Sequence, residues 1–159
     1  MKKVIRTVVG SLALTLPAIA QAHVSILPRQ STLGATEKYV VRIPTEGKVA
    51  TTAAELDVPE GVIVETLQAP AGWKYEVKRA DDRIVSIVWQ VDVKPGEFVE
   101  VAFVARNPRS GDKILWTLRQ KFADGTTQNW TTRAEWHDAS NSSDAARCGA
   151  GEIAHARRS

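Results

Sequence analysis

The sequence predicts an all-β protein, a β-sandwich of immunoglobulin-like size built from about eight or nine short antiparallel strands. Apolar residues recur at every second position from residue 39 onward, and turn-forming residues interrupt this pattern at short intervals. No stretch of the expected domain has the period of an amphipathic helix. The 159 residues, 43% of them hydrophobic, suit one domain with a substantial core.

Each expected strand has one apolar and one polar face, which is typical of a sheet with one side in solvent. The apolar positions are, in chain order, Tyr39, Val41 and Ile43; Ala54, Leu56 and Val58; Trp73, Tyr75 and Val77; Val85, Ile87, Trp89, Val91 and Val93; Val99, Val101, Phe103 and Ala105; and Ile114, Trp116 and Leu118. Turns such as Pro95-Gly96 and Asp124-Gly125 separate them. The alternation predicts that Trp73, Trp89 and Trp116 belong to the core.

Residues 1–22 are predicted to be a cleavable signal peptide. Three basic residues near the start precede an apolar stretch over residues 8–16, and Ala20-Gln21-Ala22 matches the small-x-small cleavage pattern. The apolar stretch is too short for an ordinary membrane span. We therefore expect an exported protein, periplasmic or secreted, that begins at His23 and has no membrane span after cleavage.

The net charge of +3 belongs to this predicted signal peptide. Residues 1–22 hold three of the 21 Lys and Arg residues and none of the 18 Asp and Glu residues, so the rest of the chain has 18 of each. A nucleic-acid-binding domain usually carries a clear excess of positive charge. The sequence therefore argues against a nucleic-acid partner.

Residues 138–159 are predicted to form a disordered polar tail, which leaves residues 23–137 as the folded domain. The tail has almost no bulky apolar side chain, so folding would not bury enough surface to offset the lost conformational entropy. It contains the only Cys, Cys148, together with His155, and the sequence leaves the role of both open. The only Met is Met1, so the mature chain offers no thioether to a soft ion such as Cu(I).

A chain that begins at His23 carries two nitrogen donors on one residue. The free α-amino group and the imidazole Nδ1 of His23 can chelate one metal ion without any help from the fold. Borderline nitrogen donors favour Cu(II), and the amine holds its proton only loosely near neutral pH. The N-terminal residue is therefore a candidate Cu(II) site.

Five segments of the chain resemble the YcnI-like family of exported copper-binding domains. They are His23-Val24-Ser25-Ile26-Leu27-Pro28, residues 37–46, residues 51–62, Pro70-Ala71-Gly72-Trp73, and Asp124-Gly125 followed by Trp130. The resemblance covers residue 23 to about residue 136. It implies an immunoglobulin-like sandwich that holds one Cu(II) by a single-histidine brace. Carried over residue by residue, it implies His23 as the brace, Glu55 as a carboxylate ligand and Trp130 beside the metal.

The residues themselves support Glu55 and Trp130 to different degrees. Glu55 lies on the polar face of its expected strand, where it is either a ligand or an ordinary solvated side chain, and Asp57 competes for the same role. Trp130 stands alone among polar residues 126–132, where it either covers a copper ion or caps the end of the sandwich. Its indole N–H can only donate a hydrogen bond, so it is not a conventional ligand.

The predicted function is copper handling without catalysis, as a chaperone, store or sensor of Cu(II), with copper and other copper-handling proteins of the envelope as partners. His137 would turn the site into a two-histidine brace if it reached the metal, although a histidine at a domain edge is usually solvated. One alternative is a copper-dependent oxidative enzyme resembling a lytic monooxygenase. The other is a sandwich that binds a non-metal ligand.

Overall fold

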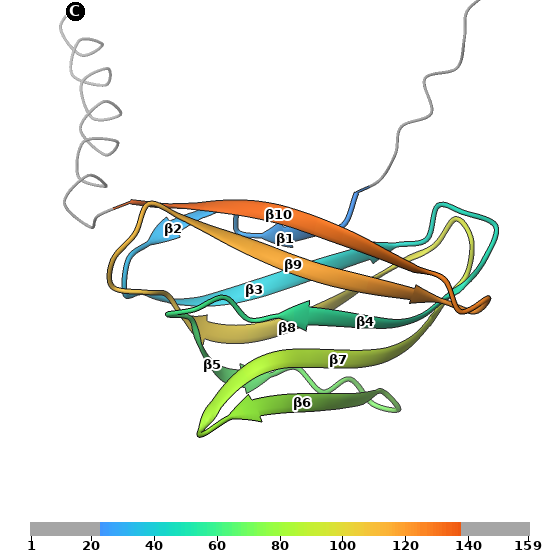
Figure 1. Cartoon of the computed structure of the whole chain (residues 1–159), viewed down its shortest axis with the longest axis horizontal. Helices are drawn as coiled ribbons and strands as arrows, with labels where there is room; N and C mark the ends of the chain where they lie inside the picture. The colour runs from blue at the N-terminus through green and yellow to red at the C-terminus, as the bar shows by residue number, and fades with distance from the viewer. Residues whose placement is uncertain (1–22, 138–159) are drawn as a thin grey trace, which may run out of the picture.

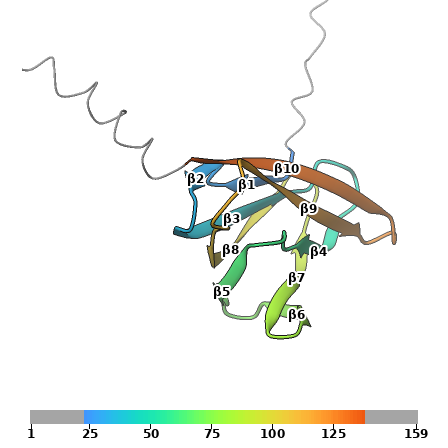
Figure 2. The same cartoon turned by 60° about the vertical axis from the view of Figure 1, so that its left-hand side comes forward.

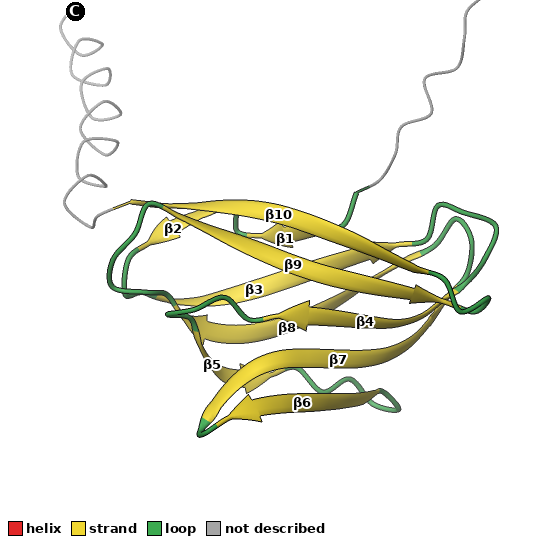
Figure 3. Ribbon diagram, viewed as in Figure 1, coloured by secondary structure: helices red, strands yellow, loops and turns green. Residues whose placement is uncertain are grey.

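Every regular element in residues 23–137, the part that the computed structural model describes, is a β-strand (Figure 3). The strands are β1 (Ser25–Leu27), β2 (Gln30–Thr32), β3 (Thr36–Pro44), β4 (Thr51–Asp57), β5 (Ile63–Leu67), β6 (Lys74–Ala80), β7 (Arg83–Val93), β8 (Phe98–Arg106), β9 (Lys113–Phe122) and β10 (Thr127–His137). This confirms the all-β prediction. The expected signal peptide and polar tail lie outside the described residues, within which no helix is long and apolar enough to cross a membrane.

The strands form two sheets that pack face to face (Figures 1 and 2). One has the order β1-β3-β8-β5 and the other the order β2-β10-β9-β4-β7-β6. The structure has ten strands rather than eight or nine, and β2 pairs with β10 in parallel rather than antiparallel orientation. The strands β1 and β2 have only three residues each, too few to show an alternating pattern in the sequence.

Apolar side chains from the inner faces of both sheets fill the core. Its centre is aromatic: the Tyr39 ring lies 5.3 Å from Phe103 and 5.1 Å from Trp116, measured between centroids. Trp89 and Trp116 are buried as predicted. Trp73 is only partly buried, and Tyr75 is 39% exposed. Both belong to the region of β6, and an edge strand has fewer neighbours to cover its apolar face.

The loops that follow β3, β7 and β9 gather at one end of the sandwich (Figure 1). Backbone hydrogen bonds tie them together, since Thr45 donates its N–H to Glu97 at 2.9 Å and Ala123 donates to Ala50 at 2.9 Å. The start of β1 lies at the same end because β1 runs antiparallel to β3, with Ser25 opposite Arg42. His23 and Val24, which precede β1, are thereby brought beside the loop that follows β3.

Candidate metal centre

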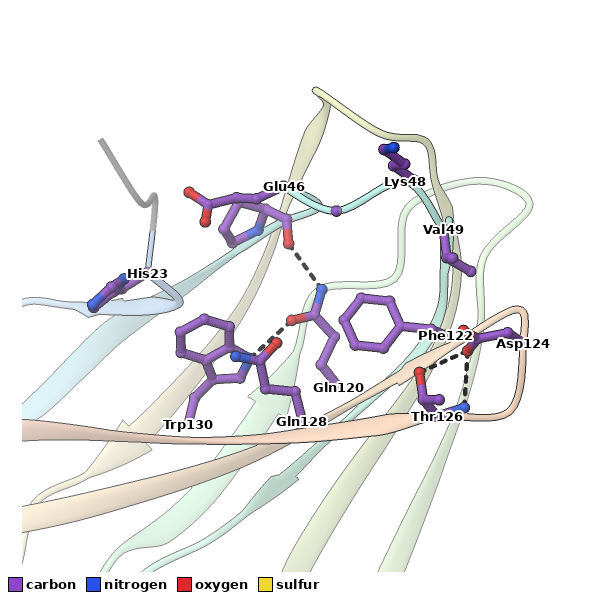
Figure 4. A pocket seen from close by; sticks show the side chains of 12 residues that line it. His23, Glu46, Lys48, Val49, Gln120, Phe122, Asp124, Thr126, Gln128 and Trp130 are labelled. Carbon is purple, nitrogen blue, oxygen red and sulfur yellow. Dashed lines mark hydrogen bonds between the residues drawn. The ribbon is translucent and has the colours of Figure 1, made fainter. Parts of the chain in front are cut away.

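A cavity of about 560 Å³ opens at this end of the sandwich (Figure 4). Its walls come from the start of the described chain, the β3–β4 loop and the paired strands β9 and β10. The residues that matter for metal chemistry are His23, Glu46, Asp124 and Trp130, with Gln120 at its base. The cavity therefore combines one imidazole, two carboxylates and one indole.

His23 and Trp130 lie next to each other in this cavity. Their ring centroids are 5.5 Å apart and the rings are tilted by 48°. The exposed His23 is held through its neighbour Val24, which is buried and accepts a hydrogen bond from the Thr132 hydroxyl at 3.3 Å. Trp130 pairs with the buried Leu118 across β9 and β10, so its side chain points to the inner face. The structure thus brings together two of the three predicted site residues.

Glu46 is the carboxylate that shares the cavity wall with His23 and Trp130. It follows the end of β3 by two residues and its side chain is exposed. The antiparallel register of β1 and β3, extended by two residues from Ser25 opposite Arg42, places His23 opposite Pro44. Figure 4 shows the Glu46 carboxylate on the side of the cavity where His23 lies.

Asp124, the other carboxylate in the cavity, is engaged within its own turn. Its Oδ1 accepts hydrogen bonds from the Thr126 hydroxyl at 2.6 Å and the Thr126 N–H at 2.9 Å (Figure 4). These bonds hold the pKa of Asp124 below its usual range. Asp124 therefore stabilises the β9–β10 turn. Glu46 is the carboxylate best placed to bind a metal ion beside His23.

Glu55 lies on the opposite face of the six-stranded sheet. It pairs with Arg119, the neighbour of Leu118, and successive residues of a strand point to opposite sides. Its carboxylate contacts Lys78 Nζ at 2.5 Å, Arg119 Nη1 at 2.7 Å and the Ser86 hydroxyl at 3.1 Å. The structure therefore does not bring Glu55 together with His23 and Trp130. The prediction that Glu55 lies on the polar face is correct, but its carboxylate is paired with Arg119 of the adjacent strand β9 and with Lys78 of the edge strand β6.

The two other candidate ligands, Asp57 and His137, do not line the cavity either. Asp57 lies on the same outer face as Glu55, because the two are two positions apart in β4. His137 ends β10, seven residues beyond Trp130, which is about 23 Å along an extended strand. Within residues 23–137, no group of three or more His, Cys, Asp and Glu side chains is arranged to hold a metal ion.

The sequence does not predict Glu46 as a site residue, because its neighbours in space are set by pairing between strands that are distant in the sequence. The segment 37–46 was part of the family resemblance, and Glu46 is its last residue. A useful signal was available: a carboxylate just beyond the end of a predicted strand lies at a sheet end, where loops carry function more often than strand faces do.

The contacts of Glu55 predict a role in stability. The hydrogen bond from Lys78, assisted by Ser86 and by the charges of Lys78 and Arg119, keeps the pKa of Glu55 below its usual range despite partial burial. The stabilisation is therefore complete above about pH 4.3, where an unfolded Glu titrates, and is lost as the pH falls through the lower folded-state pKa.

The substitution Glu55→Gln is expected to lower the free energy of unfolding by about 1 kcal/mol at pH 7, since surface ion pairs contribute modestly. Urea denaturation at pH 7 and at pH 3 measures the effect. The difference between variant and wild type should shrink at pH 3, because this is below the pKa of an unfolded Glu and part of the stabilisation is already lost there. An equal difference at both pH values would contradict an ionic role.

Comparison with known proteins identifies a family and a relative of this chain. Residues 23–148 match the family described as a domain of unknown function (DUF1775). Copper-binding protein CutI of Bacillus subtilis (strain 168) is 35% identical over 127 residues, covering 78% of this chain. The chain spans only 62% of the length of CutI.

A solved structure from Nocardia farcinica, described as an immunoglobulin-like fold, superposes with a TM-score of 0.60 and 26% identity over 68% of this chain and 83% of that one. This supports the immunoglobulin-like fold of the sandwich. The family match covers most of the sequence and begins at His23. The chain therefore belongs to the DUF1775 family, in agreement with the predicted YcnI-like membership.

Proposed function

We propose that this chain binds one Cu(II) ion in the cavity between His23, Glu46 and Trp130, as an exported protein that handles copper. The observation that carries the proposal is the 5.5 Å approach of the His23 and Trp130 rings in a cavity that Glu46 also lines. The 35% identity to a protein named for copper binding supports the choice of metal.

The donor set of the cavity suits Cu(II). Cleavage after Ala22 would free the α-amino group of His23, and the amine and imidazole together would form one chelate. A Glu46 oxygen would add negative charge against the dication. Residues 23–137 contain neither Cys nor Met, so no sulfur in this domain favours Cu(I).

Trp130 would contribute through its ring rather than as a nitrogen ligand. Its Nε1–H donates a hydrogen bond to Gln120 Oε1 at 2.9 Å, so the nitrogen is already engaged. The indole would cover one side of the ion, limit the approach of water and exclude bulky ligands. This role agrees with its partial burial against the core.

In this proposal copper is a cargo that enters and leaves. Both His23 and Glu46 are exposed, so the ion would exchange with a donor or acceptor without opening the sandwich. Such access suits a chaperone, store or sensor in the periplasm or outside the cell. Catalysis would additionally require a substrate at the ion.

The proposal is tested by titrating the chain that begins at His23 with Cu(II). We expect one equivalent to bind, with nitrogen hyperfine structure in the electron paramagnetic resonance spectrum. The ion should broaden the indole N–H resonance of Trp130 far more than that of Trp116, which lies in the aromatic core. Reduction should release the metal to a Cu(I) chelator. Equal broadening of both indoles, or no stoichiometric binding, would refute the site.

A further inference from the structure

Gln120 is a buried polar residue at the base of the cavity, and its whole amide group is hydrogen-bonded. The side chain is 1% exposed. Its Nε2 donates to the Pro44 carbonyl oxygen at 2.8 Å and to Thr51 Oγ1 at 2.6 Å, while its Oε1 accepts from Trp130 Nε1 at 2.9 Å (Figure 4). One side chain of β9 therefore contacts both β10 and the end of β3.

The chemistry of the partners fixes the orientation of this amide. An indole N–H only donates and the Pro44 carbonyl only accepts, so the amide oxygen must face Trp130 and the amide nitrogen must face Pro44. A rotated amide would place two donors against each other on one side and two acceptors on the other. The indole of Trp130 is thereby held at a defined angle in the metal-free chain.

The network continues from Gln120 to the residue that precedes Glu46. The hydroxyls of Thr51 and Thr45 lie 2.6 Å apart, and both residues are buried. Thr45 is also held through its backbone, since its N–H donates to Glu97 at 2.9 Å and its carbonyl accepts from Gly96 at 2.8 Å. The loop that carries Glu46 is thus fixed at its first residue.

An irregularity in β4 makes this network possible. Ala54 and Leu56 point inward, so strict alternation would turn Thr52 inward and Thr51 outward. The pairing of β4 with both neighbours shifts register between Thr51 and Ala53, and Thr51 is fully buried. A bulge can re-aim a side chain in this way, and here it directs the Thr51 hydroxyl to Gln120.

We infer that Gln120 is the positioning residue of the copper cavity, which holds the Trp130 indole and the Glu46 loop in a fixed relation before metal arrives. This inference rests on the proposed function for its copper readout. Holding both walls in advance reduces the ordering that binding would otherwise require, so the contacts of Gln120 strengthen Cu(II) binding without touching the ion.

The first test replaces Gln120 by Met, which keeps the length of the side chain and removes all three hydrogen bonds. Loss of a residue that orients ligands typically costs about 10- to 100-fold in metal affinity, and we expect Gln120→Met to fall in this range. In the metal-free protein, the indole N–H of Trp130 should exchange with solvent faster than in wild type. The two readouts are a Cu(II) competition titration and hydrogen exchange followed by NMR.

A matched pair at Thr51 tests the same network with smaller changes. Thr51→Val keeps the shape and removes the hydroxyl, whereas Thr51→Ser keeps the hydroxyl. We expect Thr51→Val to weaken Cu(II) binding severalfold and Thr51→Ser to restore the wild-type value. Ser86→Ala is the control. Ser86 is also buried and hydrogen-bonded, but its hydroxyl donates to Glu55 on the outer face of the six-stranded sheet. Ser86→Ala should lower stability and leave Cu(II) affinity unchanged.

The outcomes separate this inference from the proposed function. If wild type does not bind Cu(II), the proposed function fails, and the exchange rate of the Trp130 indole in Gln120→Met still decides whether Gln120 positions it. Wild-type affinity together with wild-type indole exchange in Gln120→Met would overturn the inference. If Gln120→Met does not fold, the Thr51 pair decides, and equal Cu(II) affinity in Thr51→Val and Thr51→Ser overturns it.

Discussion

A chain with one extra residue before His23 is expected to fold normally and to lose most of its affinity for Cu(II). The added residue converts the α-amino group into an amide, which does not bind a metal at neutral pH unless it loses its proton. It also moves the new terminal amine away from the imidazole. Since even residues that merely orient metal ligands are worth about 10- to 100-fold in affinity, losing a ligand itself should cost about 100-fold or more.

The fold should survive this change because His23 is exposed and precedes β1, and terminal residues contribute little to a core. The comparison requires the chain that begins at His23, the same chain with one preceding residue, and His23→Ala. Chelator competition gives the three Cu(II) affinities, and thermal unfolding without metal gives the three stabilities. Equal Cu(II) affinity in the first two chains would exclude the amine as a donor.

The main strands were predictable because alternation is a local property of the sequence. The patterns around Tyr39, Ile87 and Phe103 mark β3, β7 and β8, and these residues are buried as their positions require. The partial exposure of the apolar face of β6 was not predictable, because it follows from the position of β6 at the edge of its sheet. The short strands β1 and β2 exist through pairing with β3 and β10, which residue order alone does not reveal.

The candidate site was also only partly predictable from the sequence. His23 and Trp130 are local anomalies, a histidine at a predicted cleavage point and a lone aromatic residue in a polar strand, and both line the cavity. Glu46 reaches them only through the antiparallel pairing of β1 with β3. Glu55 was placed on the correct face of its strand, but its ion-pair partners come from positions 23 and 64 residues away. A single sequence contains no direct record of such pairings.

The second large expected effect is a difference in Cu(II) affinity between substitutions at Glu46 and at Glu55. Glu46→Gln is expected to weaken Cu(II) binding by about 1–3 kcal/mol, roughly 5- to 150-fold in Kd, because it removes the charge that offsets the dication. Its stability should match wild type, since Glu46 is an exposed loop residue. Asp124→Asn removes the other carboxylate charge of the cavity, and should weaken binding by less than about threefold because Asp124 is engaged with Thr126.

Glu55→Gln should show the opposite behaviour, with Cu(II) affinity unchanged and stability lower by about 1 kcal/mol. The two substitutions are chemically identical, so any contrast between them reports position alone. Chelator competition and urea denaturation on both variants give a two-by-two comparison in which each substitution changes one property. The structure explains why: the sheet separates the carboxylate that faces Lys78 and Arg119 from the cavity that contains His23. Weaker copper binding in Glu55→Gln, with normal binding in Glu46→Gln, would mean that copper binds on the outer face instead.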